Sequence, residues 1–398
     1  MGDFGGKPSR VTPSPTLPPA GGGRCRRFDS ITALSREAWN QCFIGALEDY
    51  DYCLALERAA IPGFTLCYYA LHDSDALLAA FPVFFTDYDL ATTADGMVKS
   101  ILSRIGAKLK LACVGSFATE TALIAMHPQG TAQQKRQWFA QLLAFFKADA
   151  AAHKTKLLAF KDLNAANKTL FGELLAREKF TCVPGMPGAV SLIGFKSIEE
   201  YLAGLSAATR KDMRRKLKKQ GDIRIAYTRD IEPHIESIYA LYLQTRARSD
   251  LQFEELTRDY FREVAKSPNG LSSLYFRGET LIGCNLMLAG HGRLLDKFFC
   301  MGGDGQEHNL YFISWFANLQ YCIDRGFTAY HSGQAGYETK LRLGSALEEN
   351  WMYFHHRNGL ANALLKLAAP LLAFDIPQTA VPALRASTMS TGTGGENK

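Results

Sequence analysis

The most constraining feature of this sequence is an order of strand-like and helix-like segments that occurs twice along its 398 residues. In the first half, apolar runs at 64–71 and 76–85 predict a hairpin, and a strand, a loop, a helix and another strand follow it. In the second half, the same order begins with the runs at 270–276 and 281–289. Such alternation favours an α/β or α+β fold over a bundle or a sandwich. We therefore expect two domains of one fold, although the halves share no obvious residue identity.

Length and composition are consistent with two ordinary cores, because 47% of the residues are hydrophobic and the chain exceeds the size of one typical domain. Both ends are rich in small and polar residues, which favour disorder. The predicted organisation is a disordered leader at 1–27, an N-terminal domain at 28–195, a C-terminal domain at 196–358 with a basic linker helix at 199–221, a helical extension at 359–385 and a disordered tail at 386–398.

The cysteine content and the hydropathy of the chain indicate its cellular location. The nine cysteines are scattered without a CxxC pair, which favours reduced thiols and a cytoplasmic location. The apolar stretch at 359–374 contains Lys366 and Pro370 and is shorter than the roughly 20 residues of a membrane span. We expect it to form a helix packed on the body of the protein, with peripheral membrane contact as the less favoured alternative.

The basic excess of the chain is concentrated in one predicted helix. Residues 210–219 include seven basic residues and one acidic residue, a net charge of +6 that equals the net charge of the whole chain. Arg210, Arg214 and Lys218 are spaced to share one face, while Met213 and Leu217 form the apolar stripe. Such a ridge suits the phosphates of a nucleotide-bearing donor, an anionic lipid or a tRNA, although a solvated charged face remains the alternative. No aromatic residue is interleaved in the ridge, which weakens the case for sequence-tolerant single-strand binding, and no DNA partner is expected.

Two motifs carry a family resemblance. The segment GQAGYETKLRLG at 333–344, together with SAATR at 206–210 and the pair Arg214 and Arg215, resembles the FemAB-like branch of the GNAT acyl-CoA N-acyltransferase superfamily. The resemblance covers residues 28–358. It implies two tandem GNAT-like domains, each with a mixed central sheet flanked by helices.

The resemblance also implies an activity. We expect an N-acyltransferase that uses acyl-CoA or an acyl carrier protein thioester as co-substrate, without a tightly bound cofactor, and a small-molecule amine as acceptor. The family includes aminoacyl transferases of peptidoglycan synthesis, so aminoacyl-tRNA is the alternative donor, although 199–221 is too short for the long inserted arm of some of those enzymes. A non-catalytic binding module is the third hypothesis.

Acyl transfer needs an anchor for the donor, a stabiliser for the oxyanion and groups that move protons. A glycine-rich turn before a predicted helix at 310–325 could supply the anchor, because free N–H groups at a helix N-terminus suit phosphates. The candidate cofactor-binding residues are Gly303, Gly305, Asn309 and Tyr311, with a plain strand-to-helix loop as the alternative. A similar turn lies at 127–131. No metal-ligand spacing is present, and no metal is expected.

Two candidate catalytic residues lie near the FemAB-like motif. The resemblance implies a tyrosine that protonates the leaving group, and Tyr337 has the required hydroxyl, whereas Phe171 in the first half lacks one. A buried tyrosine bonded to a backbone carbonyl is the alternative. His331 could take a proton from the attacking amine, or could be structural. The predicted substrate-binding residues are Arg210, Arg214, Gln334, Lys340 and Arg342, each of which could instead be a solvated surface group.

Overall fold

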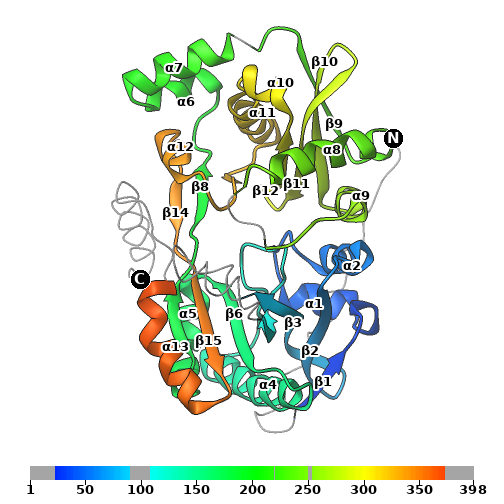
Figure 1. Ribbon diagram of the computed structural model, residues 1–398, viewed down its shortest axis with the longest axis vertical. Coiled ribbons are helices and arrows are strands. Elements are labelled where there is room, and N and C mark those ends of the chain that lie inside the picture. Colours follow the sequence, from blue (N-terminus) through cyan, green and yellow to red (C-terminus); the bar gives the residue numbers. More distant parts are fainter. Residues whose placement is uncertain (1–22, 90–107, 219, 250–252, 373–398) are drawn as a thin grey trace, which may run out of the picture.

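The computed structural model describes residues 23–89, 108–218, 220–249 and 253–372, which build two mixed sheets stacked one above the other (Figure 1). The lower sheet, sheet A, has the order β1-β2-β3-β4-β6-β15-β7, with β5 paired to β3. Its strands are β1 (Arg24–Phe28), β2 (Phe64–Asp73), β3 (Ala76–Asp89), β4 (Lys108–Val114), β5 (Ala125–Met126), β6 (Leu157–Leu163), β7 (Thr181–Pro184) and β15 (Trp351–His356).

The upper sheet, sheet B, has the order β14-β8-β13-β12-β11-β10-β9. Its strands are β8 (Gly188–Leu192), β9 (Ile223–Thr228), β10 (Gly270–Arg277), β11 (Thr280–Gly290), β12 (Arg293–Met301), β13 (Ala329–His331) and β14 (Ala346–Glu348). Within the described residues each sheet contains one parallel pair, β4 with β6 and β12 with β13. A helix connects the strands of each pair, as parallel neighbours require. The predicted repeat is therefore confirmed.

Helices cover the faces of both sheets. They are η1 (Ile31–Ala33), α1 (Arg36–Cys42), α2 (Tyr50–Ala59), α4 (Ala132–Ala152), α5 (Ala165–Arg177), α6 (Ile198–Gly204), α7 (Ala207–Leu217), η3 (Glu232–His234), α8 (Ile235–Arg246), α9 (Arg258–Lys266), α10 (Gly303–Glu307), α11 (Leu310–Arg325), α12 (Tyr337–Arg342) and α13 (Gly359–Leu372). No helix in the described ranges is both long and apolar enough to cross a membrane.

Local signals place several helix ends as predicted. Thr131 caps α4 through a capping box with Gln134, and Gly326 ends α11 in the left-handed conformation. The single linker helix expected at 199–221 is instead two helices, because Ser206 accepts a hydrogen bond from the backbone of Thr209 and starts α7 anew.

The two sheets exchange strands near the ends of the predicted domains. We expected the segment before residue 195 to belong to the N-terminal domain and the segment before 358 to the C-terminal one. In the structure, β8 pairs with β13 and β14 of sheet B, and β15 lies between β6 and β7 of sheet A. The segments 181–192 and 346–354 thus form one antiparallel ribbon that runs through both sheets.

The described core is continuous between the two sheets. One cluster of buried side chains joins α2, β4 and β6 to α8, α9 and β10–β12. At its centre the hydroxyl of Tyr52 donates to the carbonyl of Ala118 at 2.6 Å and lies 3.4 Å from the hydroxyl of Tyr260. The rings of Phe64, Phe84 and Phe253 pack beside them. The halves therefore share apolar surface whose exposure would cost free energy.

The exchanged strands predict that neither half folds alone. Residues 23–195 lack β15 from the middle of sheet A, and residues 196–372 lack β8 from sheet B, so each fragment exposes unpaired strand edges. We expect no cooperative thermal transition by circular dichroism for either fragment, and recovery of the transition when both are co-expressed. Two fragments that each unfold cooperatively in isolation would contradict this interpretation.

Candidate functional site

The centre of sheet B opens where β12 parts from β13. The two strands pair only from Arg293 to Leu295 on β12 and from Ala329 to His331 on β13. Although β12 is the central strand of the sheet, its residues Leu295, Phe298 and Phe299 remain partly exposed, whereas most of β11 beside it is buried. We call the region where the two strands part the β12–β13 opening.

Buried charged side chains lie where the two halves meet beside this opening. We define the interdomain charge cluster as Glu48, Glu120, Lys161, Asp162, Lys297 and Lys340. The Nζ of Lys297 pairs with a carboxylate oxygen of Glu48, and these side chains are 3% and 7% exposed. Buried charges are costly unless they are paired, and they concentrate at functional sites. The cluster is therefore the leading site candidate in the described part of the chain.

Glu120 links the N-terminal half to the FemAB-like motif. Its Oε1 accepts a hydrogen bond of 3.3 Å from the backbone N–H of Gln334. Gly333 has a φ of +82°, and a Cβ there would lie 2.8 Å from the same oxygen, so the close approach requires glycine. Burial raises the pKa of Glu120, while Lys297 and Lys340 oppose the rise. Sequence reasoning missed this residue, although it is the lone acid in an otherwise apolar and small-residue stretch at 112–126.

Lys340 is buried, and its ammonium group holds the motif loop in place. Its Nζ donates to the carbonyl oxygens of Ser332, Gly333 and Gln334 at 2.6, 2.8 and 3.3 Å. Burial lowers the pKa of Lys340 to about 8, and the nearby Glu120 and Asp296 limit that fall. Three carbonyl acceptors use all three ammonium protons, so the side chain is charged at neutral pH. The side chain of Gln334 also belongs to this loop and donates to the carbonyl of Met186 at 2.9 Å.

Asp296 lies at the point where β12 parts from β13. Its Oδ2 accepts a hydrogen bond of 2.6 Å from the hydroxyl of Tyr330, and its Oδ1 accepts from the side-chain amides of Asn285 and Asn318 at 3.0 and 3.3 Å. Burial raises the pKa of this carboxyl to about 6, and the hydrogen bonds from Tyr330 and Asn285 counter the rise. Three donors favour the carboxylate, so Asp296 is ionised at neutral pH.

The two predicted catalytic residues are placed differently. The hydroxyl of Tyr337 is buried and donates to the carbonyl of Pro187 at 2.9 Å, which is the structural alternative considered for it. Its proton is therefore engaged with the backbone. His331 ends β13 at the opening and remains partly exposed. Burial, with Arg293 nearby, lowers the pKa of His331 to about 4, so the imidazole is neutral at pH 7 but only a weak base.

The predicted phosphate anchor is a short helix instead of an open loop. The backbone N–H groups of Gln306, His308 and Asn309 donate to carbonyls of α10 and its flanking residues, so they are not free for a ligand. Asn309 precedes α11 in the left-handed conformation and makes no side-chain cap. Gly303 is exposed and Gly305 is buried. Tyr311 is partly exposed in the first turn of α11, and its hydroxyl bonds to no residue within the described ranges.

The basic ridge lies on α7, next to the first turn of α11. The Nζ of Lys216 is 3.5 Å from the ring centre of Phe312, the neighbour of Tyr311. Asp212 pairs with Lys216 at 3.1 Å and with Arg342 of α12 at 3.5 Å. These contacts place α7 beside both helices that border the opening.

The predicted ligands Arg210 and Arg214 have different surroundings on this ridge, and Lys211 lies beside Arg214. The guanidinium of Arg210 donates to the carbonyls of Ala203 and Leu205 and so closes the end of α6. Arg214 and Lys211 are exposed, and neither forms an ion pair with a described residue. They line a surface groove of about 660 Å³ along α7.

Comparison with known proteins assigns the family and the fold. A family model named FemAB-like, described as peptidoglycan biosynthesis/recognition, matches residues 30–367. A crystal structure of FemX superposes with a TM-score of 0.53 at 10% identity, over 76% of this chain and 91% of that one. The C-terminal domain of a protein from Agrobacterium fabrum assigned as a lysylphosphatidylglycerol synthetase gives a TM-score of 0.52 at 9% identity, over 84% and 96%.

A tandem GNAT protein from the clavulanic acid biosynthesis pathway is also similar, with 13% identity, a TM-score of 0.49 and coverage of 84% of this chain and 98% of that one. No curated protein sequence gave a significant match. The expected fold of two tandem GNAT-like domains is confirmed. The family supports a transferase and leaves the donor and the acceptor open.

The raised pKa of Asp296 predicts a pH-dependent contribution to stability. Between pH 7 and pH 5 the folded protein takes up a proton here, whereas the unfolded chain, with an ordinary pKa of 3.8, does not. Proton uptake by the folded state stabilises it, so wild type should gain about 1 kcal/mol relative to Asp296→Asn over this interval. Urea unfolding of both proteins at the two pH values measures the difference. If the difference in free energy of unfolding between wild type and Asp296→Asn stays constant, or becomes smaller at pH 5, the raised pKa of Asp296 is refuted.

Proposed function

Because the chain belongs to the FemAB-like family, we propose that it is an aminoacyltransferase that moves an aminoacyl group from a tRNA to an amine of a cell-wall or lipid-linked acceptor. The single observation that carries this proposal is the β12–β13 opening, which leads to buried acids and is bordered by a basic ridge. The site thus offers proton acceptors at depth and phosphate-binding cations at its rim.

The basic ridge favours a tRNA as the carrier. Lys211 and Arg214 are exposed and free of ion pairs with described residues, and α7 contacts the first turn of α11 at the rim of the opening. A polyanion bound along α7 would direct its charged 3′ end towards the opening, since phosphate contacts position a nucleic acid without reading its sequence.

An acyl-CoA or carrier-protein thioester is the competing donor. A thioester donor would need free amide hydrogens in the loop after β12. Those of Gln306, His308 and Asn309 are bonded to carbonyls, which leaves the amides of Gly303, Asp304 and Gly305 as its candidate anchor. Both donors remain distinguishable by direct assay.

The proposed reaction needs one proton acceptor and one proton donor. The acceptor amine attacks the carbonyl carbon of the aminoacyl ester and loses a proton to Glu120, and the C–O bond to the ribose breaks. The ribose oxygen takes a proton from the Tyr311 hydroxyl, which bonds to no described residue. Asp296 interacts electrostatically with both side chains, which supports assigning them to one site. Burial raises the pKa of Glu120, which makes its carboxylate a stronger base than an ordinary glutamate.

Replacement of Glu120 by Gln should remove the proton acceptor and lower kcat by about 10²- to 10⁴-fold with little change in KM. The assay is transfer of a labelled amino acid from a mixture of charged tRNAs to amines that include a peptidoglycan stem peptide. Glu338→Gln, an exposed acid on α12, is the matched control and should retain activity. Equal losses in both variants, or none in Glu120→Gln, would argue against this role.

Neutralising Lys211 and Arg214 together, as Lys211→Gln with Arg214→Gln, should weaken tRNA binding and reduce the slope of log affinity against log salt by about 2. Fluorescence anisotropy with labelled tRNA over a salt series measures both quantities. The double variant Arg177→Gln with Lys266→Gln changes net charge equally on α5 and α9 and should leave the slope unchanged. Tight binding of acyl-CoA without binding of tRNA would show that the donor is acyl-CoA and not aminoacyl-tRNA.

A further inference from the structure

The last described helix exposes an apolar face to solvent. In α13, Leu360, Leu364 and Leu367 are 74%, 58% and 78% exposed, and their spacing of four and three residues places them on one side of the helix. Isolated exposed leucines are ordinary, but a row of three on one helix face marks an interaction surface. These are three of the seven large hydrophobic side chains that are exposed in the described ranges.

The opposite face of α13 holds the helix on sheet A. Leu365 packs into the core, and the side-chain amide of Asn362 donates to the carbonyl of Lys179 at 3.0 Å and accepts from the backbone N–H of His356 at 2.8 Å. The helix is therefore anchored with its leucines pointing away from the protein. It contains no acidic residue, and Lys366 is its charged side chain.

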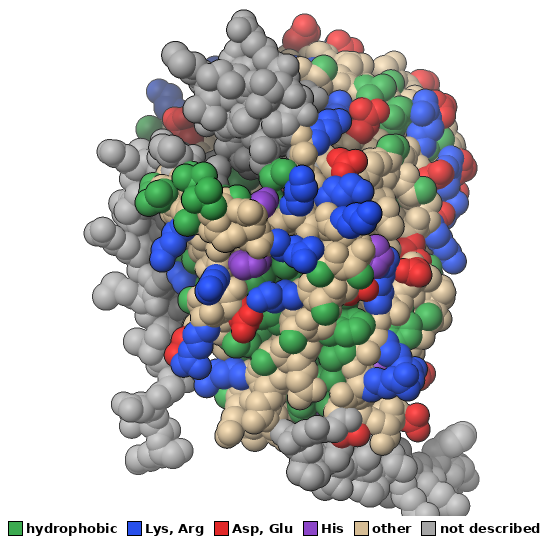
Figure 2. All heavy atoms as spheres, turned by 60° about the horizontal axis from the view of Figure 1, so that its bottom comes forward, with side chains coloured by type: hydrophobic (Ala, Val, Ile, Leu, Met, Phe, Trp, Pro, Cys, Tyr) green, Lys and Arg blue, Asp and Glu red, His purple; other side chains and the backbone are tan. Residues whose placement is uncertain are grey.

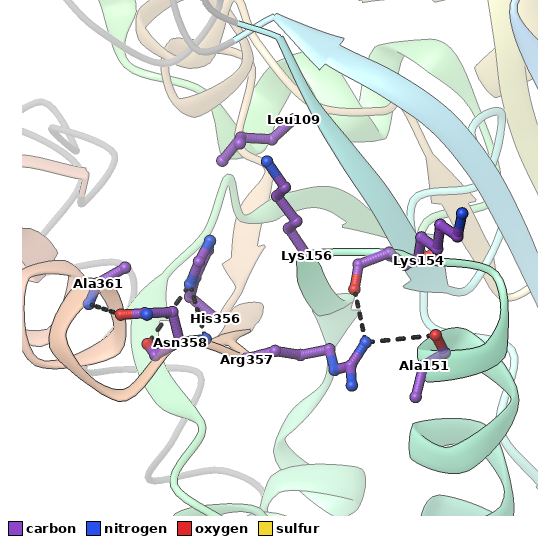
Figure 3. Close-up of a pocket in the computed structure, with 9 residues that line it drawn as sticks. Leu109, Ala151, Lys154, Lys156, His356, Arg357, Asn358 and Ala361 are labelled. Atoms are coloured by element: carbon purple, nitrogen blue, oxygen red, sulfur yellow. Dashed lines mark hydrogen bonds between the residues drawn. The ribbon is translucent and has the colours of Figure 1, made fainter.

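A basic pocket lies at the start of the same helix. Ala361 of α13 lines a pocket of about 570 Å³ together with Lys154, Lys156, His356 and Arg357 (Figure 3). The guanidinium of Arg357 donates to the carbonyls of Ala151 and Thr155 at 3.4 and 3.5 Å, which orients it at the end of α4. No carboxylate lines the pocket, and its lysines and arginine form no ion pair with described residues. Such a site suits a phosphate.

Cations and apolar side chains lie on the same end of the molecule. Figure 2 shows Lys and Arg side chains spread over the end that lies at the bottom of Figure 1, and a patch of hydrophobic side chains on the side where α13 lies. Lys108 and Lys110 of β4 flank Leu109 in the pocket wall and are exposed, although Asp87 faces Lys110 across the strand pair. A surface that combines leucines with cations matches a bilayer, which presents acyl chains beneath anionic headgroups.

We propose that α13 and the Lys154/Lys156/Arg357 pocket form a docking site for an anionic membrane surface. The three leucines insert among the acyl chains, α13 lies in the plane of the interface, and a lipid phosphate occupies the pocket. Charge complementarity selects a bilayer over a second copy of this chain, because the pocket carries a net positive charge and would repel its own copy. The proposal does not depend on the proposed transfer reaction, since neither Glu120 nor α7 takes part.

Sedimentation of the full chain with vesicles tests the proposal. Binding should be strong to phosphatidylcholine vesicles that contain about 30% phosphatidylglycerol and weak to phosphatidylcholine alone, and added salt should reduce it. The double variant Leu364→Gln with Leu367→Gln should lower the partition coefficient about a hundredfold, since burial of each leucine is worth roughly tenfold. Lys154→Gln with Lys156→Gln should remove most of the preference for phosphatidylglycerol.

Two controls separate docking from loss of folding. Leu243→Gln removes an exposed leucine from α8, and Arg58→Gln with Lys266→Gln removes two exposed cations from α2 and α9, so both should bind vesicles as wild type does. Thermal unfolding of each variant should match wild type. No vesicle binding by the full chain, or binding unchanged by the α13 variants, would overturn the proposal. Self-association that disappears with the leucines, without vesicle binding, would instead assign this face to a contact between copies.

Discussion

The antiparallel ribbon of residues 181–192 and 346–354 determines how the rest of the molecule is arranged. Its lower part is β7 with β15 in sheet A, and its upper part is β8 with β14 in sheet B. At the crossing point the backbone N–H of Gly185 donates to the carbonyl of Asn350 at 2.9 Å, and the Asn350 side chain donates to the carbonyls of Glu120 and Met186. Both strands of the ribbon run without a break from one sheet into the other, and these hydrogen bonds hold them together at the crossing point. A hinge there would have to break the Gly185–Asn350 bond and the bonds of the Asn350 side chain.

The ribbon and the shared core explain how charged groups can be buried at the interface. Glu120 comes from a loop of the N-terminal half, whereas Lys297 and Lys340 come from sheet B and α12, so the cluster exists only while the halves are held together. An unpaired charge at such a site would destabilise the protein by several kcal/mol, about as much as the whole margin of stability allows. Full hydrogen bonding by loop carbonyls at Lys340, and pairing of Glu48 with Lys297, offset that cost. Acids with raised pKa values at an opening are what proton transfer requires.

The sequence predicted the features that depend on nearby residues. The hairpin of β2 and β3, the capping box of α4 and the glycine that ends α11 all follow from short patterns, and the structure contains each of them. The strands that pair with β15 lie some 170 to 200 positions earlier in the chain, and no local pattern distinguishes a strand of sheet A from one of sheet B. The candidate site residues could not be predicted for the same reason. A sequence motif identified Tyr337, but in the folded protein its hydroxyl donates to the carbonyl of Pro187. Glu120, which no sequence pattern identified, instead contacts the motif loop.

We expect the β12–β13 opening to receive the reacting end of the donor. A crystal structure with a short RNA that carries a 3′-aminoacylamino end, in which an amide replaces the labile ester, would test this. The amide carbonyl should lie inside the opening, within hydrogen-bond reach of Glu120 or Tyr311, and the phosphates should lie against α7. An aminoacyl end bound elsewhere, with packed side chains filling the opening, would contradict this expectation.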